Sequence, residues 1–320
     1  LSLPRPRPQD PAYVIYTSGT TGVPKGVEIS HGAAWNTIEV VNRRLGIRPY
    51  DRVLGVSAFD FDLSVYDAFG VLAAGGCLVT IADEARRDAV VWLDLVESCR
   101  ITVWNSVPTL FEMLLTSAAG APERLASLRH VLLSGDWIDV GLPSRMAELM
   151  PDGHILAMGG ATEAAIWSNA IELTGAVPED WVSIPYGRAL EHQAYRVVDA
   201  EGRDCPDHVA GELWIGGLGV ATGYVDDPEL TAKKFVDVEG SRWYRTGDLG
   251  CFWQDGTIEF LGRSDNQIKL RGHRIEPGEV EAACEALLPV TRAVCVPVRG
   301  SASSSLVVFV QPEQPLAPDG

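Results

Sequence analysis

The sequence lacks several features that would place the protein in other classes. It has no run of roughly 18 apolar residues, the length of a membrane helix, and its first residues, LSLPRPRP, contain no apolar signal-peptide segment. Positive charge is scarce, since 26 Lys and Arg stand against 43 Asp and Glu, a net charge of −17. Nucleic acids bind basic surfaces, so this balance argues against them. We expect neither a membrane nor a nucleic acid as partner.

Cysteine pairs and histidine clusters are also missing. The six cysteines are scattered without a C-x-x-C pair, at positions 77, 99, 205, 251, 284 and 295. In a chain of this size, that pattern favours reduced thiols in a cytoplasm and argues against a zinc site. The six histidines form no group with the spacing of metal ligands, at positions 31, 130, 154, 192, 208 and 273. We therefore expect a cytoplasmic protein whose own residues alone hold no metal.

The composition is that of a globular protein of about two domains. Of the 320 residues, 46% are hydrophobic and 22% are charged, which is ordinary for such a protein. The Pro/Arg-rich first residues are typical of a linker that enters from an upstream segment.

A stretch rich in glycine and hydroxyl side chains, YTSGTTGVPKG at 16–26, follows an apolar run at 12–16 that predicts a buried strand. Glycines let a backbone approach an anion, successive N–H groups form a concave nest, and Lys25 adds a positive charge. The spacing Gly19-x-x-Gly22-x-x-Lys25 differs from that of the common P-loop. We expect a phosphate-binding loop here; a flexible surface hairpin is the alternative.

Five further motifs follow in order along the chain. They are FDLS at 61–64, GGATE at 159–163, GELWIGG at 211–217, YRTGDL at 244–249, and GRSD at 262–265 running into KLRG at 269–272. Together with YTSGTTGVPKG, they resemble the signature motifs of the adenylate-forming (acyl-activating) superfamily. That superfamily includes acyl-CoA synthetases, luciferases and the adenylation domains of non-ribosomal peptide synthetases. The resemblance covers nearly the whole chain.

The order of predicted elements favours an α/β fold followed by smaller parts. Strands are expected at 53–58, 77–82, 101–105 and 131–133, alternating with helices at 31–44, 64–74, 89–99 and 108–115. This alternation predicts a parallel sheet flanked by helices. Short strands that predict a small antiparallel meander or barrel are expected at 195–198, 211–215, 243–244, 250–253 and 258–260.

The resemblance implies the adenylate-forming fold, incomplete at both ends. We expect residues 1–264 to form a partial N-terminal core, with an α/β part at 1–185 and a β-barrel part at 186–264. Residues 265–320 are expected to begin a small, mobile α+β C-terminal subdomain, with Asp265 at the hinge. A solvated turn carboxylate is an equally good interpretation of Asp265 from the sequence alone.

Adenylate formation joins a carboxylate to the α-phosphate of ATP and expels pyrophosphate, so ATP and Mg²⁺ are the expected cofactors. Residues expected to bind ATP by this resemblance are Thr17, Ser18, Gly19, Thr20, Thr21, Gly22, Lys25, Gly160, Ala161, Thr162, Asp248 and Arg263. Within this set, Thr162 and Lys25 are the expected catalytic residues together with Glu163. Glu163 is also the expected metal ligand, because Mg²⁺ prefers one or two carboxylates plus phosphate oxygens.

Three of these residues, Thr162, Glu163 and Asp248, also have a structural alternative. Thr162 and Glu163 could form a helix N-cap and a first-turn carboxylate. Asp248, expected in a turn where it accepts the ribose hydroxyls, could be an ordinary turn residue. Peptide synthetases usually carry a Tyr that packs on adenine before the Thr-Glu pair, whereas this sequence has Gly159 there. Tyr186 is a weak candidate to replace that ring.

Asp62 separates the subfamilies that share these motifs. In the resemblance to peptide synthetases, an Asp here pairs with the α-ammonium of an amino acid. Acyl-CoA and aryl-acid ligases have no ammonium to pair, and a buried unpaired carboxylate would be costly. Asp62 therefore favours an amino-acid substrate; its alternative role is a cap for the helix that follows.

Matching the specificity pocket residue by residue gives Asp62, Leu63, Tyr66, Asn105, Leu132, Ser134, Met158, Ile166 and Trp167. Its bulky walls leave room for a short side chain, and its lack of a second charge excludes acidic and basic substrates. The set resembles that of cysteine-activating domains in siderophore synthetases. Serine or threonine is the runner-up, because such pockets discriminate near-isosteres by only about 1–3 kcal/mol. Core packing is the alternative role for each pocket residue.

The resemblance therefore predicts amino-acid adenylation, with L-cysteine first, and transfer of the acyl group to the phosphopantetheine thiol of a carrier protein. Neighbouring synthetase domains are the other expected partners. Two alternatives are a free-standing acyl or aryl-acid CoA ligase and a non-catalytic piece that works only within a larger chain. The sequence closes before the family's C-terminal lysine, so we expect weak or absent adenylation by these 320 residues alone.

Overall fold

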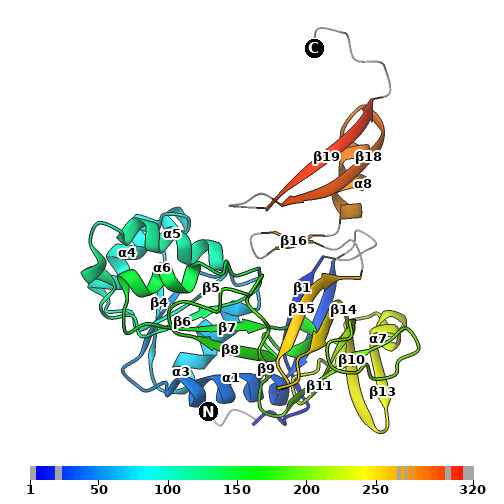
Figure 1. Cartoon of the computed structure of the whole chain (residues 1–320), viewed down its shortest axis with the longest axis horizontal. Helices are drawn as coiled ribbons and strands as arrows, with labels where there is room; N and C mark the ends of the chain where they lie inside the picture. Colours follow the sequence, from blue (N-terminus) through cyan, green and yellow to red (C-terminus); the bar gives the residue numbers. More distant parts are fainter. Residues whose placement is uncertain are drawn as a thin grey trace.

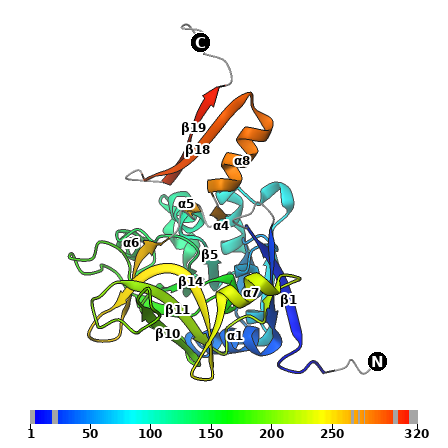
Figure 2. The same cartoon turned by 90° about the vertical axis from the view of Figure 1, so that its right-hand side faces the viewer.

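The computed structural model describes residues 5–18, 24–264, 268–270, 273–275, 277–299 and 304–312. A main body contains two large sheets, and a small unit formed by α8, β18 and β19 stands apart from it in both views (Figures 1 and 2). All six cysteines are free thiols. Within the described ranges, no helix has the length and apolar character that crossing a bilayer requires.

The largest sheet has seven strands in the spatial order β4-β3-β5-β6-β7-β8-β9. They are β3 (Arg52–Gly55), β4 (Cys77–Thr80), β5 (Val103–Ser106), β6 (His130–Leu133), β7 (His154–Gly159), β8 (Asn169–Leu173) and β9 (Arg188–Ala189). The five strands from β4 to β7 pair in parallel, whereas β8 and β9 add an antiparallel edge. The predicted parallel sheet is confirmed, and the sequence analysis missed the antiparallel edge.

Helices cover this sheet, and three of them lie where the sequence predicted helices: α1 (His31–Leu45), α4 (Ala89–Ser98) and α5 (Pro108–Ala118). Helix α6 (Leu142–Leu149) was not predicted, and short 3₁₀ turns lie at Asp83–Ala85, Pro122–Leu125 and Thr162–Ala164. The start of α1 is fixed because Ser30 accepts a hydrogen bond from the Ala33 N–H at 3.2 Å. Its end is fixed by Gly46, whose left-handed backbone closes the helix.

The predicted helix at 64–74 contains an irregular turn. It consists of α2 (Leu63–Val65), a π-helical turn η1 (Tyr66–Gly70) and α3 (Val71–Ala73). Gly70 is required there, since a Cβ would lie 2.6 Å from the Tyr66 ring. The preceding strand ends at Gly55 and not at residue 58 as predicted. π-turns inside helices often mark functional sites, and this one borders the site described below.

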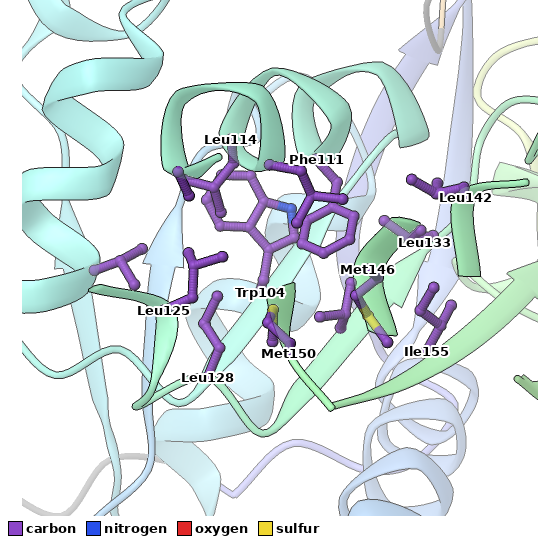
Figure 3. Packing of buried hydrophobic residues seen from close by; sticks show 14 of the residues in the cluster. Trp104, Phe111, Leu114, Leu125, Leu128, Leu133, Leu142, Met146, Met150 and Ile155 are labelled. Atoms are coloured by element: carbon purple, nitrogen blue, oxygen red, sulfur yellow. The ribbon is translucent and has the colours of Figure 1, made fainter. Parts of the chain in front are cut away.

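The core under the helices is centred on Trp104 of β5. Figure 3 shows its indole among side chains from α5, α6 and the neighbouring strands. The ring packs 6.1 Å from the Phe111 ring, centroid to centroid, and its N–H donates to Ser106 Oγ at 2.7 Å. This buried polar group is therefore satisfied, which leaves the surrounding apolar packing undisturbed.

A second sheet is entirely antiparallel, in the order β10-β11-β14-β13 with β15 paired to β14. Its strands are β10 (Gln193–Val198), β11 (Gly211–Gly217), β13 (Phe235–Val238), β14 (Ser241–Phe252) and β15 (Ile258–Arg263). The predicted meander is confirmed, with helix α7 (Pro228–Lys234) preceding β13. However, the strands predicted at 243–244 and 250–253 are two halves of β14, so Asp248 lies within a strand and the predicted turn is wrong.

The first strand of the chain is not buried as predicted. β1 (Pro11–Thr17) pairs with β2 (Lys25–Ser30), and β2 pairs with β12 (Gly223–Tyr224). Val14 is 40% exposed and Tyr16 is 63% exposed, whereas Ile15 is buried. The hairpin has one covered face, and an apolar run by itself does not distinguish this from full burial.

The last part of the described chain forms small sheets of its own. Strands β16 (Ile268–Leu270) and β17 (His273–Ile275) pair with each other, and β18 (Val290–Arg299) pairs with β19 (Ser304–Pro312). Helix α8 (Pro277–Leu287) packs against β18, where Glu281 Oε1 accepts from the Cys295 N–H at 2.8 Å. The predicted hinge residue Asp265 lies outside the described residues.

Candidate active site

A cavity that is open to solvent lies where the loops after β3, β6 and β7 face β14 and β15. It is lined by Phe61, Asp62, Leu63, Ser134, Gly135, Gly160, Ala161, Thr162, Ile166, Trp167, Tyr244, Thr246, Asp248 and Arg263. The first three loops leave the carboxyl ends of parallel strands, the edge at which open α/β sheets bind ligands. Ten of the predicted site residues thus meet around one hollow: Asp62, Leu63, Ser134, Gly160, Ala161, Thr162, Ile166, Trp167, Asp248 and Arg263.

Asp62 lies in the wall of this cavity, directly before α2. Its side chain makes no capping hydrogen bond to the helix. Instead, Thr162 Oγ1 donates to Asp62 Oδ2 at 2.8 Å, across 100 residues of sequence. The structure therefore does not support the helix-cap alternative, and it joins the acyl-pocket motif to the Thr-Glu motif by a direct contact.

The GGATEAAIW segment folds back on itself to present residues from both of its ends. Ala165 and Ile166 adopt positive φ angles of 54° and 73°, which non-glycine residues rarely do. A Cβ at Gly160 would lie 2.8 Å from the Ile166 carbonyl oxygen and 2.9 Å from the Trp167 Cα. Glycine is needed because two backbone segments approach this closely. The strained turn brings Ile166 and Trp167 to the cavity beside Thr162.

Glu163 is fully buried in the 3₁₀ turn Thr162–Ala164. Its Oε1 accepts a hydrogen bond from the Tyr224 hydroxyl at 2.8 Å. Lys25 approaches the same tyrosine from another side, with its Nζ 5.3 Å from the ring centroid. Ala161, not Thr162, occupies the N-cap position, so the N-cap alternative for Thr162 is wrong.

Tyr224 therefore links the predicted metal ligand to the predicted phosphate lysine. The sequence analysis did not find it, because no pattern in the GYVDDP segment indicates that β12 pairs with β2. Of the predicted loop, Thr17 ends β1, Ser18 follows it, and Lys25 begins β2. Gly19, Thr20, Thr21 and Gly22 lie outside the described residues.

Asp248 and Arg263 form an ion pair across β14 and β15. They are directly opposed in the strand register, and Arg263 Nη1 lies 2.5 Å from Asp248 Oδ1. Both side chains are nearly buried. Thr246 accepts from the Asp248 N–H at 2.8 Å through its hydroxyl, and its carbonyl accepts from Arg263. The carboxylate is therefore held rigidly at the cavity wall.

A second cavity, also open to solvent, shares Gly135 with the first. The rings of Tyr186 and Phe260 stack in it almost parallel, 4.9 Å apart and inclined by 5°. A Cβ at Gly159 would lie 2.9 Å from Asn169 Oδ1 and 3.1 Å from the Tyr186 ring. No side chain fits at position 159, and Tyr186 supplies an aromatic ring beside it. Burial raises the pKa of the Tyr186 hydroxyl well above its usual value, so it stays neutral.

Four of the predicted pocket residues do not line the first cavity. Tyr66, Asn105 and Leu132 are fully buried behind its wall, and Met158 lines the second cavity. The Tyr66 ring packs 5.1 Å from Trp167, whose indole N–H donates to Ser134 Oγ at 2.8 Å. Tyr66 therefore packs behind Trp167, and the three buried predicted positions do not line the cavity.

Three comparisons with known proteins agree with this geometry. Residues 2–225 match the family described as AMP-binding enzyme. The chain is 53% identical over 315 residues to the anguibactin system regulator of Vibrio anguillarum, covering 97% of this chain and 30% of that protein. It is 54% identical over 312 residues to pyochelin synthetase PchE of Pseudomonas aeruginosa, covering 97% of this chain and 21% of that protein. The chain spans less than a third of both relatives.

Solved structures show the same fold. The Vibrio cholerae adenylation domain AlmE, in complex with glycyl-adenosine-5'-phosphate, matches with a TM-score of 0.86 and 29% identity over 98% of this chain and 60% of that chain. The non-ribosomal peptide synthetase FmoA3, in its α-methyl-L-serine-AMP bound form, matches with a TM-score of 0.77 and 44% identity over 81% of this chain and 29% of that chain. The chain therefore belongs to the AMP-binding enzyme family and has the adenylate-forming fold of synthetase adenylation domains that its motifs predicted.

Proposed function

We propose that this chain activates an amino acid, most specifically L-cysteine, as its aminoacyl adenylate within a non-ribosomal peptide synthetase. The carboxylate oxygen of the amino acid would bond to the α-phosphorus of ATP while the bond to pyrophosphate breaks. The thiol of a carrier protein's phosphopantetheine would then attack the acyl carbon and release AMP. The observation that carries this proposal is the contact between Asp62 and Thr162 in one cavity with the Asp248–Arg263 pair.

Asp62 supports an amino-acid substrate in particular. Its carboxylate is buried in the cavity wall and is not used as a helix cap, so it is placed to pair with an α-ammonium group. Thr162 donates a hydrogen bond to Asp62. It would therefore hold the carboxylate of the amino acid and the α-phosphate of ATP near Asp62. Ser134 and Trp167 close the cavity beyond, which favours a short side chain such as that of cysteine or serine.

The residues around Glu163 fit ATP with Mg²⁺. When bound, the ion would neutralise charge on the phosphate oxygens. Within the described ranges, no cluster of three or more acidic, His or Cys side chains exists to enclose a metal. A single buried carboxylate, Glu163, suits an ion that keeps phosphate and water ligands. Lys25, at the start of β2, would place its charge on the same phosphates.

Asp248 and Tyr186 would place the nucleoside. Asp248 is held by Arg263 and Thr246, so its carboxylate is oriented to accept the ribose hydroxyls. The cavity that contains Tyr186 adjoins this region through Gly135, and the flat pair of Tyr186 and Phe260 offers a surface to the adenine ring. Tyr186 would thus replace the ring that Gly159 lacks.

The domain division is part of the proposal. Residues 1–264 would form the core that binds both substrates, and residues 265–320 would begin the subdomain that swings about Asp265 between the two half-reactions. A peptidyl carrier protein and neighbouring synthetase domains would be the partners of the whole protein.

The test is amino-acid-dependent ATP–pyrophosphate exchange by the full-length natural protein that contains this chain. Cysteine, serine, threonine, alanine, 2-aminobutyrate, salicylate and acetate are compared side by side. Exchange led by cysteine is the expected result. Activity with salicylate or acetate but none with amino acids would refute the role of Asp62. No exchange with any of these acids, despite ATP binding, would favour a non-catalytic role.

A further inference from the structure

Asp67 is a buried carboxyl group to which the motifs assign no role. It lies on the π-helical turn η1, one residue after Tyr66, and is only 2% exposed. The helix faces the end of β5 here, and Asn105 on that strand is fully buried opposite it. A carboxylate without a cation is costly in such a place, so its protonation state and its partner need a physical account.

The Asn105 side chain connects Asp67 to the wall of the substrate cavity. Its Nδ2 donates to Asp67 Oδ1 at 2.8 Å and to the Leu63 carbonyl oxygen at 3.1 Å. Both partners are acceptors, so the amide nitrogen must point toward them and the amide orientation is fixed. Leu63 lines the cavity and directly follows Asp62. The network therefore braces the segment that holds the amino-acid anchor.

Two atoms of this pair have no partner among the described residues: Asp67 Oδ2 and Asn105 Oδ1. They are the second oxygens of two planar groups that already share a hydrogen bond. With an ionised carboxylate both are acceptors and neither is satisfied. One proton on Asp67 Oδ2 would satisfy both, because the resulting O–H donates to Asn105 Oδ1 and closes a ring of two hydrogen bonds.

We propose that Asp67 is a positioning residue of the acyl pocket. It is a neutral carboxylic acid whose paired hydrogen bonds with Asn105 hold the Asp62–Leu63 segment in its binding geometry. The positioning role rests on the proposed function, because it concerns the amino-acid substrate. The protonation state of Asp67 does not depend on that function. Burial acts in the same direction, because it raises the pKa of Asp67 to about 8.

Among the residues that the structure describes, no cation contributes to the raised pKa of Asp67 or is its hydrogen-bond partner. Helix α1 presents the neutral Asn42, which accepts from the Tyr66 hydroxyl at 2.9 Å and donates to the Gly70 carbonyl at 2.7 Å. Strand β5 presents the neutral Asn105. The titratable groups that interact here are Tyr66 and, through it, Asp51. Burial raises the pKa of Tyr66, so its hydroxyl stays neutral.

Ionisation of Asp67 would therefore break the paired hydrogen bonds with Asn105. The O–H donor to Asn105 would be lost, and a negative charge would lie in a buried site. The amide of Asn105 would no longer be held at both ends. Because it donates to Leu63, the consequence is a looser substrate anchor and weaker amino-acid binding.

Two variants of nearly equal size test the pairing. Asp67→Asn retains it, because an amide N–H replaces the acid O–H, and we expect a KM for the amino acid close to that of the natural protein. Asp67→Leu removes both hydrogen bonds, and we expect this KM to rise about 10-fold or more while the KM for ATP is unchanged. Both are measured by pyrophosphate exchange in the full-length natural protein. An impaired Asn variant, or an unaffected Leu variant, would overturn the proposal.

Thermal unfolding against pH tests the neutral acid without any activity. A native pKa near 8, above the unfolded value of 3.8, means that the folded protein holds the extra proton, so stability falls as pH rises between about 5 and 8. Asp67→Asn lacks this loss, so its melting temperature should exceed that of the natural protein by a margin that grows over this range. A difference in melting temperature that is constant with pH would refute the claim that Asp67 is neutral in the folded protein.

The outcomes separate this inference from the proposed function. If the natural protein shows no amino-acid-dependent exchange, the proposed function is refuted. The unfolding series against pH still reports the protonation state of Asp67 in that case. The second measurement is the ratio of the amino-acid KM of the natural protein to that of the Asn variant, as a function of pH. If exchange is normal and this ratio rises above about pH 8, the positioning role is supported. The titration of the substrate itself affects both proteins equally and cancels in the ratio. Should the Leu variant fail to fold, this pH series decides the question, and a ratio constant with pH would refute the role.

Discussion

Asp62 and Thr162 show why single residues in this chain carry more meaning together than apart. Taken alone, each reads as a helix-cap residue, and the sequence offers that alternative for both. The structure gives the N-cap position of the 3₁₀ turn to Ala161 and leaves Asp62 without a capping bond, while the two side chains share a hydrogen bond of 2.8 Å. The family motifs assigned both residues to substrate binding, and their direct contact is a finding of the structure.

Replacing Asp62 tests the substrate class. Asp62→Ala should weaken amino-acid recognition by about 2–5 kcal/mol, the usual penalty for stranding a buried charge, here the α-ammonium of the substrate. The measurement is the KM for the amino acid in pyrophosphate exchange. Asp60→Ala is the matched control, because Asp60 is exposed two residues away. An unchanged KM in the Asp62 variant would refute the assignment.

Replacing Tyr186 tests the nucleoside site. Tyr186→Ala should weaken ATP binding by about 1–3 kcal/mol, the range found when an aromatic ring that stacks on a base is removed. Tyr186→Phe keeps the stack on Phe260 and should bind ATP nearly normally. Calorimetric titration with a non-hydrolysable ATP analogue measures both. Equal affinities in the Ala and Phe variants would show that adenine binds elsewhere.

The elements were predictable where local sequence determines them. Helix α1 begins at a Ser cap and ends at a left-handed glycine, and both signals are visible in the sequence. Strand β14 was split in two because Gly247, with a φ of 79°, lies inside it and resembles a turn signal. The strand continues through that glycine because β11 and β15 pair with it on both sides, and this is tertiary information.

Replacing Gly160 tests the tight turn after β7. Gly160→Ala places a methyl group 2.8–3.0 Å from the backbone of residues 166–168, which cannot yield as a side chain would. We expect a loss of about 1–3 kcal/mol in stability and a larger loss of exchange activity, because Ile166 and Trp167 would move. Gly120→Ala is the control, since a Cβ there meets nothing within 4 Å. Equal melting temperatures and activities for the two variants would contradict the tight turn.

At the scale of the whole molecule, the site depends on long-range pairing that composition and periodicity cannot supply. Tyr224 reaches Glu163 because β12 pairs with β2, almost 200 residues away in sequence. Asn105 reaches Asp67 because η1 packs on the end of β5. The family motifs predicted Tyr66 and Leu132 as pocket residues, whereas the fold shows that both are buried and do not line the cavity.

The C-terminal unit of α8, β18 and β19 is separate from the main body (Figures 1 and 2). α8, β18 and β19 bond mainly to one another, as in the contacts of Glu285 with the Ala293 N–H and of Glu281 with the Cys295 N–H. Both views show this unit away from the two large sheets (Figures 1 and 2). A chain that ends at Ser264 keeps β15 and the Asp248–Arg263 pair.

We therefore expect a chain truncated after Ser264 to unfold within a few degrees of the 320-residue chain, since little buried surface is lost. It should also keep its affinity for a non-hydrolysable ATP analogue, because the cavity-lining residues all precede that point. Scanning calorimetry and titration measure the two properties. A large fall in melting temperature would mean that the C-terminal unit contributes to the stability of the main body. A loss of nucleotide binding alone would mean that residues after 264 complete the ATP site.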